Sequence, residues 1–289
     1  MPSAEQIYRE FETFSATSTH LRFYALINHG GIPDLIRQLT QAKHDWRSLF
    51  QGSTEENAIS VAPILLPLER HPTSGTGQRM LRWIMEHGTY SSSVLLLASP
   101  LSMEELACRL ASRLDAVLPG DINVMLRYFD TRIFAELMTV LDAAQKAAFL
   151  SPASQWWYVD RRGALQSVPA TFAPHDPWTA PLALDMAQQN SLIDASEPDQ
   201  VAELLQNSVP DEYGQLPYQD RYDFIVRHSQ AAQGFGIKTL REKSFYCALA
   251  LMYGEDFALQ PVWKNGLAHV QAGTLTLKKL VEQIEEKNE

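Results

Sequence analysis

Short apolar runs alternate with helical periodicities along the first 169 residues. The segments 23–28 and 93–99 are almost continuously apolar, as is typical of short strands and, for 93–99, of a strand buried on both faces. Two further segments, 47–50 and 61–68, have an extended character. Between and after the runs, apolar residues recur with a period near 3.6 and predict four helices. Their apolar faces are residues 35, 36 and 39 in the first helix, 80, 81, 84 and 85 in the second, 106, 110 and 114 in the third, and 134, 137, 138 and 141 in the fourth.

Local signals refine these elements. Ser102 and Glu105 have the spacing of a capping box at the start of a helix. Prolines 63 and 67 should keep the segment 61–68 out of the centre of a sheet, since proline cannot donate to a strand ladder. Residues 156–168 predict a hairpin that turns at Arg162-Gly163, and residues 131–149 predict one helix. The alternation indicates an α/β lobe with a mixed or parallel sheet flanked by helices.

The pattern changes near residue 170. Three prolines in residues 172–181 suggest a linker, and only helical patterns follow. We expect these helices at 182–194, 197–207, 217–233, 240–253 and 275–287. The sequence therefore predicts an α/β N-terminal lobe, residues 1–169, followed by an all-helical C-terminal lobe, residues 170–289.

Charge is distributed unevenly between these lobes. The chain of 289 residues has a formal charge of −10, of which residues 1–169 carry −2 (15 basic, 17 acidic) and residues 170–289 carry −8 (9 basic, 17 acidic). An acidic lobe repels nucleic acid and anionic membranes and attracts a basic protein partner. A solvated acidic surface that maintains solubility is the alternative.

Compartment signals agree with one another. Cys108 and Cys247 are far apart and form no disulfide framework, which favours a reducing compartment. The first residues lack the apolar region of a signal peptide, and no apolar run approaches the ~20 residues that span a bilayer. We expect a cytoplasmic protein without a membrane segment.

The segment 122–132 carries the strongest candidate chemistry. Alternating apolar residues predict a strand that ends in Arg127, Asp130 and Arg132. In an enzyme, the two guanidinium groups would hold a phosphate and Asp130 would act as general base. In the structural interpretation, which we favour, Asp130 caps the helix that begins near Thr131 and the arginines pair with nearby carboxylates.

Other motifs lack the partners that catalysis needs. His29-Gly30-Gly31 has the form of an oxyanion loop, but the chain has no G-x-S-x-G nucleophile elbow. The segment 74–77, Ser-Gly-Thr-Gly, lacks the Lys-Ser/Thr pair of a P-loop. Eight scattered histidines form no metal-binding spacing. We therefore expect no catalytic site, no cofactor and no metal.

Taken in order, several fragments resemble a known family. These fragments are FYALIN (23–28), WRSLFQG (46–52), VAPILLPL (61–68), LRWIMEHG (81–88), SVLLLASPLSMEEL (93–106) and LRYFDTR (126–132). Over residues 20–160 the chain resembles the N-terminal domain of type VI secretion effector adaptors, the domain-of-unknown-function family numbered 4123. Two positions depart from the family pattern: Asn28 replaces an acidic residue, and Thr131 replaces a proline. Residues 234–257 are similar to the more variable C-terminal lobe of these adaptors.

The resemblance implies a function without enzymatic activity. Such adaptors, also called chaperones, bind a toxic effector in the cytoplasm and help to load it onto the VgrG spike. The toxin is commonly encoded next to the adaptor. Two alternatives stay open from the residues: a phosphoryl-handling enzyme that uses Arg127, Asp130 and Arg132, and an acidic immunity protein that inhibits a basic toxin.

An adaptor needs at least two contacts, and two lobes offer separate surfaces. We expect the α/β lobe to engage the spike and the acidic helical lobe to recognise the toxin. Aromatic residues in turn-like or helix-edge positions are the candidate anchors, because interface hot spots favour such side chains. These are Trp178, Tyr213, Tyr218 and Trp263. Core packing is the alternative for each of them.

Overall fold

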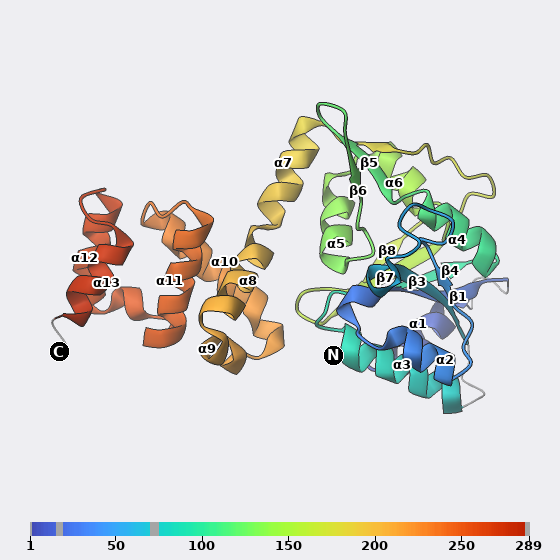
Figure 1. Ribbon diagram of the computed structural model, residues 1–289, viewed down its shortest axis with the longest axis horizontal. Helices are drawn as coiled ribbons and strands as arrows, with labels where there is room; N and C mark the ends of the chain where they lie inside the picture. Colours follow the sequence, from blue (N-terminus) through green and yellow to red (C-terminus); the bar gives the residue numbers. More distant parts are fainter. Residues whose placement is uncertain (1, 16–19, 70–74, 287–289) are drawn as a thin grey trace. The chain divides into compact units, whose positions relative to one another are not determined.

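A computed structural model describes residues 2–15, 20–69 and 75–286. Residue contacts divide the chain into two compact units, Met1–Leu192 and Ile193–Glu289 (Figure 1). The boundary predicted at 169/170 lies earlier in the chain. The first unit has an N-terminal sheet region with helices, and the region that follows consists of helices, as the sequence predicts.

A six-stranded sheet forms the centre of the first unit, in the order β2-β3-β1-β4-β7-β8. Its strands are β1 (Arg22–Asn28), β2 (Arg47–Ser48), β3 (Pro63–Leu68), β4 (Val94–Ser99), β7 (Gln155–Val159) and β8 (Leu165–Pro169). All of β4 is buried, which confirms the prediction from its apolar run. The hairpin β7–β8 is also confirmed, and its turn requires Gly163, whose φ is +76°.

Helices cover both faces of this sheet. Figure 1 shows α1, α2 and α3 on one face and α4, α5 and α6 on the other. Their bounds are α1 (Ala4–Ser15), α2 (Leu35–Gln41), α3 (Gly75–Gly88), α4 (Met103–Ala111), α5 (Thr131–Val140) and α6 (Ala143–Leu150). Ser102 and Glu105 form the predicted capping box of α4. The single helix predicted over 131–149 is wrong: Asp142 caps α6 through its own capping box with Gln145, so the chain begins a new helix.

The strand pairing refines one expectation and corrects another. Every pair in the six-stranded sheet is antiparallel, and the first unit also contains a parallel pair in its smaller sheet. The strand β3 lies inside the sheet despite its prolines, because it pairs with β1 along its whole length. The carbonyl of Pro63 accepts a hydrogen bond from Leu49 N–H on the β2 side (2.9 Å). The backbone nitrogens of Pro63 and Pro67, which carry no hydrogen, therefore face away from β1 and interrupt none of its hydrogen bonds.

A second, three-stranded sheet has the order β6-β5-β9. Its strands are β5 (Asp115–Leu118), β6 (Ile122–Met125) and β9 (Leu182–Ala183). The pair β5–β6 is an antiparallel hairpin, whereas β5 and β9 are parallel. Among the strand pairs of the described residues in the first unit, β5–β9 is the parallel one.

Residues 172–181 belong to the first unit and are not a linker. Asp176 pairs with the guanidinium of Arg113 at 2.7 and 2.9 Å, and the side chain of Arg113 is fully buried. The indole of Trp178 donates to the carbonyl of Ser112 (2.9 Å) and lies against Phe149. These contacts fasten the proline-rich segment to the end of α4, and β9 follows directly.

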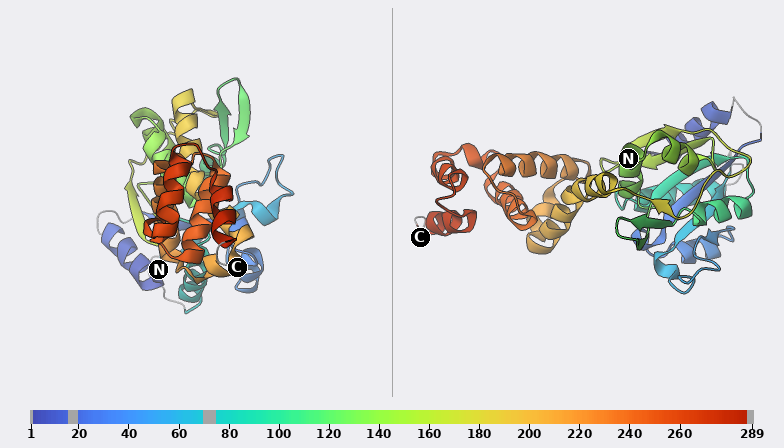
Figure 2. Two further views of the ribbon diagram at one scale, coloured as in Figure 1. Left: turned by 90° about the vertical axis from the view of Figure 1, so that its left-hand side faces the viewer. Right: turned by 90° about the horizontal axis from the view of Figure 1, so that it is seen from above.

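The second unit is built from helices, shown in orange and red in Figure 2. Their bounds are α8 (Glu197–Ser208), α9 (Pro210–Gln215), α10 (Tyr218–Gly234), α11 (Leu240–Tyr253), α12 (Pro261–Gln271) and α13 (Leu277–Glu285); α7 (Met186–Ala195) contains the boundary between the units. The sequence predicted α8, α10, α11 and α13 but missed α9 and α12. The core contains Tyr246, Phe257 and Trp263, and the half-buried Glu197 pairs with Lys243 at 2.7 Å. None of the helices in the described ranges is long and apolar enough to cross a bilayer.

Candidate functional site

A groove of about 730 Å³ lies beside the β5–β6 hairpin of the first unit. Residues 49–55 form one wall, the C-terminal end of α4 and the start of β5 form another, and residues 123–125 of β6 complete it with residues 180–181. Apolar lining comes from Leu49, Leu114, Ala116 and Val124. The volume falls within the range of ~300–1,000 Å³ that is typical of ligand-binding pockets.

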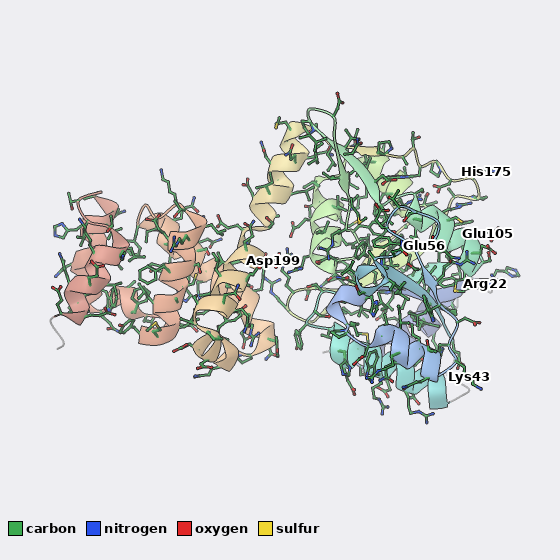
Figure 3. All side chains as sticks on the ribbon, viewed as in Figure 1. Arg22, Lys43, Glu56, Glu105, His175 and Asp199 are labelled. Carbon is green, nitrogen blue, oxygen red and sulfur yellow. The ribbon has the colours of Figure 1, made fainter. Side chains whose placement is uncertain are left out.

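The charged side chains that line this groove are acidic. They belong to Glu55 and Asp115, and the described lining residues include neither lysine nor arginine. Hydrogen bonds from Thr54 and with Ser53 lower the pKa of Glu55, so its carboxylate is ionised at neutral pH. Glu56 follows on the same exposed loop (Figure 3). The groove therefore attracts positive charge.

Strand β6 brings a free sheet edge to the groove. It is the terminal strand of its sheet. The hydrogen bond from Leu126 N–H to the Leu114 carbonyl (2.6 Å) shows which alternate residues of this chain segment point their backbone groups toward β5. In the register Ala116↔Val124, the N–H and C=O groups of Asn123 and Met125 point away from β5. Both residues line the groove.

The segment 122–132 differs from its predicted form. The strand ends at Met125, its residues are mostly exposed, and Ile122 is 55% exposed, because β6 lies in the small sheet and not in the central one. Residues 126–130 form a turn that leads into α5. The predicted strand is therefore present but shorter than expected, and Arg127, Asp130 and Arg132 follow it in the turn and in α5 and do not lie at its end.

The structure brings two of the three charged residues of this segment together. The buried Asp130 caps α5 by accepting from Arg132 N–H (3.0 Å), and the guanidinium of Arg132 donates to both of its carboxylate oxygens (3.0 and 2.6 Å). Arg127 is exposed and lies 5.7 Å from the centroid of the Phe129 ring. The cap and the ion pair match the structural interpretation of Asp130.

The four predicted anchors occupy different environments. Trp263 (2% exposed) and Tyr213 (5%) lie in the core of the second unit, so core packing describes them and they are not surface anchors. Trp178 is half-buried, and its ring lies against Arg113 in the first unit. Tyr218 is 56% exposed, with the Arg221 guanidinium 3.9 Å from its ring centroid. Of the four, Tyr218 has the accessibility that a partner contact needs.

A second exposed surface was missed by the sequence analysis. Four large apolar side chains are exposed where α11 ends and α12 begins: Met252 (53%), Tyr253 (37%), Leu259 (72%) and Val262 (58%). We call these residues the α11–α12 corner. Its signal was present in the sequence, since Gly254 and Pro261 mark a helix end and a helix start around an apolar segment.

The other candidate motifs do not assemble into a site. His29-Gly30-Gly31 forms a short 3-10 turn, and Gly31 lies so close to Ser93 that no side chain would fit there. Gly75 and Gly77 belong to the first turn of α3, while Ser74 lies outside the described residues. Within the described ranges, no group of three or more His, Cys, Asp or Glu side chains is placed to hold a metal ion.

Comparison with known proteins supplies one match. Residues 23–148 match the model of the family described as Domain of unknown function (DUF4123), a family of the type VI secretion effector-adaptor type. This match confirms the resemblance noted in the sequence. It covers every residue that lines the groove except residues 180–181. Neither the curated proteins nor the solved structures contain a match to the chain.

Proposed function

Because residues 23–148 carry the DUF4123 domain of the type VI secretion effector-adaptor type, we propose that this chain is such an adaptor. It binds a cognate toxin, encoded beside it, in the cytoplasm and promotes the loading of that toxin onto the VgrG spike. The family match is the observation that carries the proposal. No catalytic step and no cofactor are part of it.

The state of the charged residues supports a binding function over a phosphoryl-handling one. Asp130 is 4% exposed and already engaged by the backbone and guanidinium of Arg132. A general base must reach a substrate proton, and a capped and paired carboxylate is poorly placed to do so. Arg127 lies apart from this pair, over Phe129.

Two compact units support two separate contacts. The family match falls within the first unit, so we assign spike engagement, the contact common to such adaptors, to that unit. The second unit then recognises the toxin. Its α11–α12 corner exposes four large apolar side chains, which suits a protein interface.

Deletion of the gene in the producing strain tests the proposal. Export of the neighbouring toxin should stop, while the toxin keeps its activity when purified. The full-length chain should also co-purify with the toxin and with VgrG. If deletion instead made the producing cells sensitive to their own toxin and left export unchanged, the chain would be an immunity protein and the proposal would be wrong.

The α11–α12 corner gives a site-specific test. Replacing Leu259 and Val262 with aspartate should weaken toxin binding by at least about tenfold, since each change puts a charge into an apolar interface. Spike binding should stay unchanged. The control is Glu203→Lys, at an exposed position of α8 in the same unit. Equal toxin binding by wild type and the double variant would remove the corner from the interface.

A further inference from the structure

We propose that the groove beside β6 binds an extended, positively charged segment of the spike protein, which adds to β6 as a further strand. This inference rests on the proposed adaptor function and specifies the contact of its first unit. It combines three features of the same place: a free strand edge, two carboxylates and an apolar floor.

The backbone of β6 determines the form of the ligand. Asn123 and Met125 direct their N–H and C=O groups away from β5 and line the groove. An extended segment laid along this edge pairs with those groups, as in strand-addition complexes. Four residues of β6 at ~3.3 Å each present an edge of about 13 Å, which matches a segment of about four residues. A helix would leave these backbone groups without partners.

The side chains determine its charge. Glu55 and Asp115 line the groove, and lysine and arginine are absent from its described lining. A segment with a lysine or arginine places a cation between acidic walls. Met125, which is 39% exposed, and the half-buried Val124 supply apolar surface for the aliphatic part of such a side chain, while Leu49, Leu114 and Ala116 lie buried beneath the groove.

Position in the chain selects the spike over the toxin. All but residues 180–181 of the lining fall inside the stretch that matches the family model. The proposed function assigns the spike contact to the family domain and the toxin contact to the second unit. The groove is also confined to the first unit.

Binding of the purified spike protein of the same secretion system to the full-length chain tests the inference. The double variant Glu55→Lys/Asp115→Lys should weaken binding at least about tenfold, because it reverses the charge of the groove. Asn123→Trp should weaken binding by filling the groove from β6. Raising the salt from about 0.01 M to about 0.1 M should weaken wild-type binding and affect the charge-reversed variant less.

Matched controls separate these effects from general damage. Glu203→Lys/Asp211→Lys makes the same charge change in the second unit, and Asn190→Trp makes the same substitution at an exposed residue of α7 that does not line the groove. Both should bind the spike like wild type. Circular dichroism and melting temperature should be equal for all variants compared.

The outcomes distinguish the inference from the function on which it rests. If wild type binds the spike and both groove variants bind it equally well, the inference is wrong and the adaptor function stands. If the groove variants lose the toxin but keep the spike, the groove belongs to the toxin and the inference is again wrong. If wild type binds neither protein, the proposed function itself fails.

Discussion

Replacing Arg113 with methionine should destabilise the first unit more than any surface change. The guanidinium is fully buried and donates to the carbonyls of Phe149 (2.8 Å) and Ala148 (3.0 Å) as well as to the carboxylate of Asp176 (2.7 and 2.9 Å). Methionine keeps much of the apolar volume but removes every donor. Three carbonyls, those of Arg109, Ala148 and Phe149, and the carboxylate of Asp176 then each lose a charged donor.

The expected loss follows from the burial of each partner. Breaking a buried ion pair by removing one partner costs ~3–5 kcal/mol, since the remaining charge stays desolvated. The side chain of Asp176 retains 22% exposure and can regain some water, so the lower end of about 3 kcal/mol applies. With a urea slope of ~2 kcal/mol/M, the unfolding midpoint should fall by about 1.5 M.

Tryptophan fluorescence during urea unfolding measures this loss, because five of the six tryptophans lie in the first unit. These are Trp46, Trp83, Trp156, Trp157 and Trp178. Asp176→Asn and the double variant complete a double-mutant cycle, which isolates the coupling of the pair. A loss below about 1 kcal/mol in Arg113→Met, or an equal shift of the second unit's transition by calorimetry, would refute the reasoning.

Two further predictions concern pH and packing. Burial by itself would raise the pKa of Asp176, but the hydrogen bonds and charge of Arg113 outweigh burial and lower that pKa. The ionised Asp176 therefore stabilises the folded state above the ordinary carboxyl range, and this stabilisation is lost as pH falls through the lowered pKa. Melting temperature against pH should show this loss in wild type and not in Asp176→Asn. Gly266→Ala should destabilise the second unit by ~1–3 kcal/mol in calorimetry, because the new methyl group would overlap Leu280. Gly214→Ala has open space around it and should stabilise α9 by up to ~1 kcal/mol. Equal effects of the two changes would contradict the packing argument.

The sequence predicted elements whose signal is local. The apolar run of β4, the cap at Ser102 and the turn at Gly163 each lie within a few residues, and the structure confirms all three. The break between α5 and α6 was missed because the apolar period continues through Leu141, so the helical pattern masked the cap at Asp142. Where two local signals disagree, as the helical period and the cap do at residues 141–142, the sequence alone does not show which one determines the structure.

The groove could not be predicted, because its walls come from four separate stretches of the chain. The hairpin beside it did carry a signal: Gly120 and Asp121 both adopt positive φ (+84° and +58°), and a short loop with glycine between apolar residues indicates a hairpin. Burial of Trp263 and Tyr213 depends on how several helices pack, which no spacing within one helix determines.

The attachment of residues 172–184 limits where a different helical lobe could be joined to the first unit. Asp176, Trp178 and β9 complete the first unit after its last central strand has ended. A recombination event that joined a new helical lobe at residue 170 would remove the counter-charge of the buried Arg113 and one strand of the small sheet. Exchange of helical lobes is therefore compatible with folding when the junction lies near residue 192, where the first unit is complete.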